Sequence, residues 1–183
     1  MRRDTISAIC LTLLLPLAAA AANCTSTRPR TSDLVSKGLL NPAIAPERRQ
    51  RLADRLLCSA LAGNAASQEL AGTLYYEGRM RKGNPLLRDT SRARRMLSAA
   101  ANRGRRHAMH RLAELELADG HAYEAALWTR VEQAIHGPAA PPVANLHRKI
   151  ESRVSPDARL HTDVLLKVEA IREAMEADAS LQR

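Results

Sequence analysis

The amino-acid sequence predicts an all-α fold, and three observations support this prediction. Apolar residues make up 45% of the 183-residue chain, but there is no Phe, one Trp and three Tyr, so the core of this single domain must consist mainly of Ala and Leu. These residues have high helix propensity, and Ala lets helices pack closely. No stretch shows the polar and apolar alternation, rich in Val, Ile and aromatic residues, that is typical of β-strands. Glycines also recur at the ends of helix-length segments.

Residues 1–22 have the pattern of an export signal and are excluded from the predicted fold. Two arginines near the start precede an apolar run that ends in small residues, and cleavage after Ala20 or Ala22 fits the usual rule. The run is too short to span a bilayer comfortably. We therefore expect a periplasmic protein that has been secreted across the inner membrane.

Residues 23–44 are predicted to form a flexible N-terminal arm. The arm contains Cys24, at the position of a lipid-modified cysteine, but Asn23 stands where a lipoprotein signal has a small residue, so lipidation is the weaker alternative. After removal of the signal, Cys24 and Cys58 remain, and an oxidising compartment would allow them to form a disulfide. The alternative for Cys58 is a small buried thiol in an Ala-rich helix.

Residues 45–137 are predicted to contain successive helices whose ends are marked by Pro, Asp and Gly. Pro46 can occupy the first turn of a helix, and Asp89 can cap another whose end is marked by Gly104. Gly104 and Gly137 are separated by about one repeat length. The expected helices span residues 46–62, 65–77, 90–103, 107–119 and 123–136.

The chain changes character after Gly137. Residues 138–142 are predicted to be a short Pro-rich linker, and residues 143–183 a C-terminal helical hairpin. The second helix of this hairpin has an apolar stripe made of Leu160, Val164, Val168, Ile171 and Met175. We expect the stripe to cap the helical array, while the alternative is a short seam for a second chain.

The sequence contains AG at 71–72 and YYEG at 75–78, followed by a pattern of Asp, Ala, Leu and Gly over 89–112. These motifs resemble the Sel-one-like repeat family, a branch of the tetratricopeptide-repeat class. The resemblance covers residues 65–137, and its second unit lacks the final Ala-Ala-x-x-Gly. It implies a short right-handed α-solenoid of helix-turn-helix repeats with a terminal helical hairpin as its cap. It also implies a role as an adaptor that assembles other proteins, but it implies no reaction.

A concentrated block of positive charge lies between Arg79 and Arg111, where eleven basic residues accompany a single acid, Asp89. Such a block attracts anionic partners, here another envelope protein with an acidic surface or, alternatively, anionic lipid or glycan. A further interpretation is that the block is only a solvated surface with no binding function. Nucleic acid is not expected, because the export signal removes the chain from the cytoplasm and no aromatic residues accompany the arginines. The predicted basic patch consists of Arg92, Arg94, Arg95, Arg103, Arg105 and Arg106.

A polar helix face is the second candidate site. His107, His110 and Glu114 share one face, but the neighbouring Arg111 would repel a cation and no zinc motif is present, so no metal or cofactor is predicted. In the resembling family the first helix of each pair lines a concave surface, which implies a binding groove here. The groove residues are Tyr75, Tyr76, His107, His110, Arg111 and Glu114.

Motifs for catalysis are missing from the sequence. It contains no Gly-rich phosphate loop, no G-x-S-x-G elbow and no Ser-x-x-Lys pair. We therefore predict a non-catalytic protein–protein interaction scaffold in the bacterial cell envelope. The alternatives are an envelope protein attached to anionic lipid or glycan through its Arg-rich face and, more weakly, a cell-wall-related enzyme. The sequence predicts neither the identity of the partner nor the oligomeric state.

Overall fold

The structure is a computed structural model that describes residues 29–138, 141–155 and 157–180. These residues form eight α-helices and one short 3-10 helix, and they contain no β-strand, so the prediction of an all-α fold is confirmed. None of these helices is both long enough and apolar enough to cross a membrane. The helices are α1 (Thr31–Ser36), α2 (Pro46–Leu61), α3 (Ala65–Glu77), α4 (Thr90–Ala101), α5 (Arg106–Ala118), α6 (Ala122–His136), α7 (Pro141–Glu151) and α8 (Ala158–Ser180).

Local capping explains why several helix boundaries could be recognised in the sequence. The Asn64 side chain accepts a hydrogen bond from the Ser67 backbone amide (2.9 Å) at the start of α3. The Asp89 carboxylate accepts one from the Arg92 amide (2.8 Å) at the start of α4. Both bonds satisfy an amide that has no partner within its helix. The ends of α3 and α6 are followed by glycines with positive φ, as helix C-termini commonly are.

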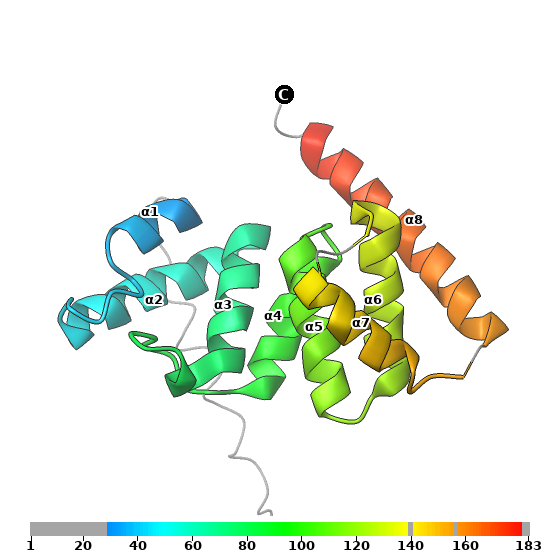
Figure 1. The fold of residues 1–183 in the computed structure, drawn as a ribbon. Coiled ribbons are helices and arrows are strands. Elements are labelled where there is room, and N and C mark those ends of the chain that lie inside the picture. Colours follow the sequence, from blue (N-terminus) through cyan, green and yellow to red (C-terminus); the bar gives the residue numbers. More distant parts are fainter. Residues whose placement is uncertain (1–28, 139–140, 156, 181–183) are drawn as a thin grey trace, which may run out of the picture.

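The helices form an elongated row in which neighbours in sequence pack side by side (Figure 1). The pairs α3–α4 and α5–α6 are in contact, and α4 packs on α5 between them. In addition, α3 contacts α5, and α5 contacts α7. Alternate helices of this part of the row therefore meet along one side, which we call the α3/α5/α7 face.

Small side chains allow close packing in the core, as expected for a chain without Phe. An added Cβ at Gly72 in α3 would lie 2.7 Å from Leu97 Cγ and 3.0 Å from the Leu97 backbone nitrogen in α4. A glycine therefore lets these two helices approach each other. Large side chains such as Leu97 and Leu112 fill the remaining space and are fully buried. The buried alanines between the helices include Ala93, Ala100, Ala101, Ala108, Ala113, Ala125 and Ala126.

The N-terminal segment corrects the prediction of a flexible arm over residues 23–44. Its described part contains α1, which contacts α2 and α3. Leu34 and Leu39 are fully buried, and burial of two leucines fixes the segment on the helical row. The predicted signal peptide, residues 1–22, lies outside the described residues.

The predicted disulfide involves one cysteine inside and one outside the described residues. Cys58 in α2 is disulfide-bonded. Its predicted partner, Cys24, lies outside the described residues. The pairing of Cys24 with Cys58, like lipidation of Cys24, stays a prediction.

The C-terminal region differs from the prediction in one helix boundary and in the packing of its two helices. Helix α7 begins at Pro141, inside the predicted linker of residues 138–142. The predicted hairpin of residues 143–183 is instead a pair of helices that both pack on α6 (Figure 1). Helix α7 also contacts α5, while α8 lies beyond α6 at the end of the row. The α8 side chains buried there are Leu160, Val164, Val168 and Ile171.

Candidate functional site

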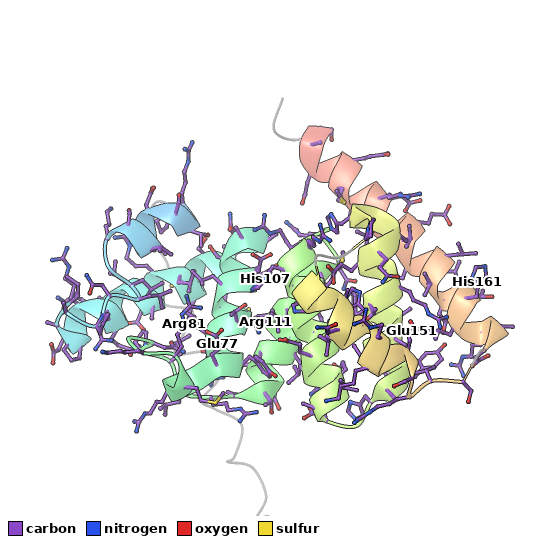
Figure 2. All side chains as sticks on the ribbon, in the orientation of Figure 1. Glu77, Arg81, His107, Arg111, Glu151 and His161 are labelled. Atoms are coloured by element: carbon purple, nitrogen blue, oxygen red, sulfur yellow. The ribbon has the colours of Figure 1, made fainter. Side chains whose placement is uncertain are left out.

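The α3/α5/α7 face brings together charged side chains from separate helices. Arg111 in α5 donates one hydrogen bond to Glu114 (Nη1 to Oε2, 2.7 Å) and a second to Glu77 in α3 (Nη2 to Oε1, 3.4 Å). Arg81 donates to the other oxygen of Glu77 at 3.0 Å. Figure 2 shows Glu77, Arg81 and Arg111 together, where the end of α3 meets α5, with His107 also on α5. Glu77 was not among the predicted groove residues, although it belongs to the YYEG motif.

Tyr76 belongs to the same charged group. Its side chain is half-buried, and the Arg88 guanidinium lies 5.9 Å from the ring centroid. Burial raises the pKa of the Tyr76 hydroxyl, and the nearby Glu114 carboxylate raises it further. Tyr76 therefore keeps its proton and offers a neutral hydroxyl to this face.

Tyr75 lies elsewhere, which corrects its predicted place in the groove. Its ring is buried, and its hydroxyl accepts a hydrogen bond from Arg92 Nη1 at 3.2 Å. The Arg92 guanidinium also lies 5.5 Å from the ring centroid. Consecutive residues of a helix point about 100° apart, so the two tyrosines of the motif cannot share one face. Tyr75 joins α3 to α4, and Tyr76 faces α5.

Ionised Glu114 stabilises this group. Burial opposes its ionisation, but hydrogen bonds from His110 and Arg111, together with the charge of Arg111, lower its pKa to about 2. The ordinary pKa of a glutamate is about 4.5, so the folded protein binds a proton here less readily than the unfolded chain does. The resulting stabilisation is present above the unfolded-state pKa and is lost as the pH falls from about 5 towards 2.

We expect this loss to appear as a pH-dependent effect of Glu114→Gln. At pH 7 the variant should have a lower free energy of unfolding than the wild type, and the difference should shrink as the pH approaches 3. Urea denaturation at pH 7, 5 and 3 measures it. Glu124→Gln is the control, because Glu124 is exposed and forms no ion pair within the described residues. A difference for Glu114→Gln that is constant over this pH range would contradict the role assigned to the carboxylate.

A buried polar cluster lies deeper, between α5, α6 and α7. It consists of His110, Glu132 and His147, and one nitrogen or oxygen from each lies within 4.8 Å of the others. Glu132 is 2% and His147 3% exposed. The His110 and His147 ring centroids are 6.3 Å apart. Burial lowers the pKa of His147, although the Glu132 charge opposes this.

This cluster differs from the histidine face considered from the sequence. His107 and His110 are near each other, with ring centroids 6.5 Å apart, but His107 is exposed. Glu132 and His147 were not predicted as site residues. They belong to two other helices, so no spacing within one helix could have revealed their approach to His110.

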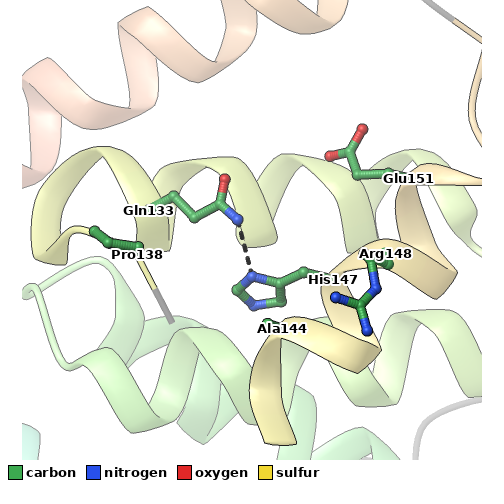
Figure 3. Close-up of a pocket in the computed structure, with 6 residues that line it drawn as sticks. All are labelled: Gln133, Pro138, Ala144, His147, Arg148 and Glu151. Carbon is green, nitrogen blue, oxygen red and sulfur yellow. Dashed lines mark hydrogen bonds between the residues drawn. The ribbon is translucent and has the colours of Figure 1, made fainter. Parts of the chain in front are cut away.

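A shallow pocket opens beside the buried cluster. Figure 3 shows that Gln133, His147 and Glu151 come from α6 and α7, and that the Gln133 amide lies against His147 (Nε2 to Nδ1, 3.0 Å). Arg130 holds α6 to α7 by donating to both Glu151 oxygens, at 3.0 and 2.7 Å. This paired hydrogen bond lowers the pKa of the Glu151 carboxyl. The pocket is lined by Gln133, Pro138, Ala144, His147, Arg148 and Glu151.

The predicted basic patch is largely neutralised by carboxylates of the same chain. Arg94 pairs with Glu116 and Asp119, and Arg95 is the only patch residue that forms no ion pair with the described part of the chain. Most of the partners belong to other helices, so these arginines form ion pairs that connect neighbouring helices. The remaining pairs are Arg92–Asp89, Arg103–Asp178, Arg105–Glu69 and Arg106–Glu132.

Comparison with known proteins gives no family for this chain. No family model matches it, and neither does any curated protein or any solved structure. The Sel-one-like resemblance therefore stays a prediction based on the motifs at 71–78 and 89–112.

Proposed function

We propose that this protein is a non-catalytic interaction scaffold and that the α3/α5/α7 face is its binding surface. The observation that carries this proposal is the contact of α5 with both α3 and α7. Three helices separated in sequence thereby contribute to one surface, as the first helices of tetratricopeptide-like repeats do. Tyr76, Arg111 and Glu114 supply this surface with an aromatic ring and both signs of charge.

The proposed partner is another protein of the bacterial cell envelope. The export-signal pattern of residues 1–22 supports this location. The net charge of +9 favours a partner with an acidic surface. Exposed cations of the basic block that form no ion pair with other described residues are Arg79, Lys82, Arg88 and Arg95.

The internal ion pairs favour a scaffold over attachment to anionic lipid or glycan. An arginine that already contacts a carboxylate of its own chain gains less from an external anion, because the existing pair must be exchanged. Five of the six patch arginines are in this situation. Reversing them would also remove contacts between helices, so these residues are unsuitable for a test of binding.

The test is in-cell crosslinking of the mature protein, followed by mass spectrometry, with charge changes at exposed positions. His107→Glu combined with Arg148→Glu changes the charge of one exposed residue on α5 and one on α7, two of the helices that form this face. Arg95→Glu is the matched control on α4. We expect the wild type and the control to recover one discrete set of proteins, and the face variant to recover it at least about tenfold less, which corresponds to 1.4 kcal/mol of binding energy.

Three outcomes decide between the proposals. Selective loss in the face variant supports the scaffold. Selective loss in Arg95→Glu would instead support attachment through the cationic surface. Recovery of the same abundant proteins from all three forms would contradict specific binding at this face. Each variant must first show the helical circular dichroism spectrum and thermal unfolding of the wild type.

A further inference from the structure

Three buried atoms in the cluster between α5, α6 and α7 have no hydrogen-bond partner among the described residues. They are His110 Nδ1, Glu132 Oε2 and His147 Nε2. Unpartnered polar atoms inside a protein are costly and call for a physical explanation. The Glu132 and His147 atoms are 3.5 Å apart, which is too long for a strong hydrogen bond.

We propose that His110, Glu132 and His147 bind one divalent transition-metal ion, with Zn²⁺ as the best match. Two imidazoles and one carboxylate form a recognised zinc ligand set, and a fourth position is then left for water or another ligand. The three residues come from three consecutive helices. A bound ion would therefore join α5, α6 and α7 at a single point.

The spacing of the donor atoms suits this ion. With Zn–N and Zn–O distances near 2.0–2.1 Å, tetrahedral ligand atoms lie about 3.4 Å apart. The separation of 3.5 Å between His147 Nε2 and Glu132 Oε2 is already close to this value. All three ligand atoms lie within 4.8 Å of one another. Bringing each pair to the tetrahedral separation therefore shortens a distance by at most about 1.4 Å, which side-chain rotation can supply.

The second atom of each ligand is held in a way that directs the first towards the cluster. Glu132 Oε1 accepts a hydrogen bond from Arg106 Nε at 3.1 Å, and the Glu114 carboxylate faces His110 Nε2 across a longer contact of 3.5 Å. His147 Nδ1 lies 3.0 Å from the Gln133 amide, whose oxygen can accept the Nδ1 proton after exchange of its O and N positions. Such contacts orient metal ligands and select the tautomer that binds the ion.

The charges around the cluster limit the affinity without preventing binding. Arg106 contacts Glu132, and Arg111 contacts Glu114, so the two carboxylates are already partly neutralised and a dication meets some repulsion. The imidazoles bind the ion as neutral donors. The set of two nitrogens and one oxygen disfavours Ca²⁺ and Mg²⁺, which prefer oxygen ligands.

The test is calorimetric titration of the full mature chain with Zn²⁺ after treatment with a chelator and its removal. Co²⁺ provides a second probe, because its visible absorption distinguishes four-coordinate from six-coordinate binding. We expect one Zn²⁺ per chain, a four-coordinate Co²⁺ spectrum, and no competition from Mg²⁺. His110→Gln and His147→Gln should each weaken Zn²⁺ binding at least about 100-fold, since each removes a direct ligand.

Two matched variants make the assignment specific. His161→Gln changes an exposed histidine of α8 and should bind Zn²⁺ as the wild type does. His107→Gln tests the alternative surface set of His107, His110 and Glu114. Unchanged binding in His107→Gln supports the buried cluster, whereas loss in His107→Gln with retention in His147→Gln would overturn it.

The partial exposure of His110 keeps the test decisive if His147→Gln fails to fold. The His110 side chain is 15% exposed, so His110→Gln is the less disruptive variant, and its circular dichroism spectrum is compared with that of the wild type. A folded His110→Gln that binds Zn²⁺ with wild-type affinity would overturn the proposal. Failure of the folded wild type to bind Zn²⁺ would do the same.

Discussion

Arg94→Ala should lower the free energy of unfolding by about 3 kcal/mol, at the lower end of the range for breaking a buried ion pair. Arg94 in α4 donates to both oxygens of Glu116 in α5, at 2.7 and 3.3 Å, and also to Asp119 at 2.5 Å. Glu116 is only 5% exposed. Removing the guanidinium therefore leaves a buried carboxylate without its main partner.

Two features keep the expected loss near 3 kcal/mol. The Arg94 side chain is 33% exposed, so water screens part of the interaction. His121 Nδ1 remains 2.8 Å from Glu116 Oε2 in the variant. Arg94→Lys should show an intermediate loss, because an ammonium group keeps the charge but cannot form the same paired hydrogen bond.

The neighbouring arginine provides a matched control for Arg94. Arg95→Ala removes the same side chain from the next position of α4, where it is exposed and forms no ion pair among the described residues. We expect a change within about 0.5 kcal/mol for this surface substitution. Urea denaturation at pH 7 measures both variants. Equal losses for Arg94→Ala and Arg95→Ala would show that the contact with Glu116 contributes nothing specific.

Leu112→Ala should also lower the free energy of unfolding by about 3 kcal/mol, with a range of 2–5 kcal/mol for such substitutions. Leu112 is fully buried in α5, a helix that contacts α3, α4, α6 and α7. The alanines around this helix already bring the backbones close together, so the structure has little freedom to collapse into the space left by a leucine. The variant therefore loses apolar burial and gains a cavity.

An exposed leucine provides the control for Leu112. Leu87 is 61% exposed, and Leu87→Ala should change the free energy of unfolding by less than about 0.5 kcal/mol. Urea denaturation of the two variants, with the slope of the transition compared as well as its midpoint, measures the difference. A small loss for Leu112→Ala with an unchanged slope would contradict the tight packing described for α5.

The sequence predicted the helices better than it predicted their arrangement. Helix ends depend on local groups, such as the Asn64 and Asp89 side chains that cap α3 and α4, and these can be recognised from a few neighbouring residues. The C-terminal region was harder, because the same amphipathic helix can pack on its neighbour or on a more distant helix. Only the three-dimensional contacts show that α7 and α8 both pack on α6.

For the candidate sites, too, contacts within one helix were predictable from the sequence, whereas contacts between helices were not. Arg111 and Glu114 were placed together by their spacing in one helix, and Tyr76 was grouped with them only through the resemblance to a repeat family whose first helices line one surface. Glu132 and His147 were missed because their approach to His110 depends on how three helices pack. The arginines were counted correctly as a block of charge, but their acidic partners come mostly from other helices, and net charge cannot show such pairing.

The order of packing along the helical row also affects how the chain folds. Most helices contact their immediate neighbours in sequence, so most native contacts close short loops at a low entropic cost. Proteins dominated by such local contacts fold rapidly. Helix α8 is an exception. Its apolar side chains cover α6, although the whole of α7 lies between these two helices in the sequence. Folding can thus proceed helix by helix along the row, and docking of α8 must wait until α6 is in place.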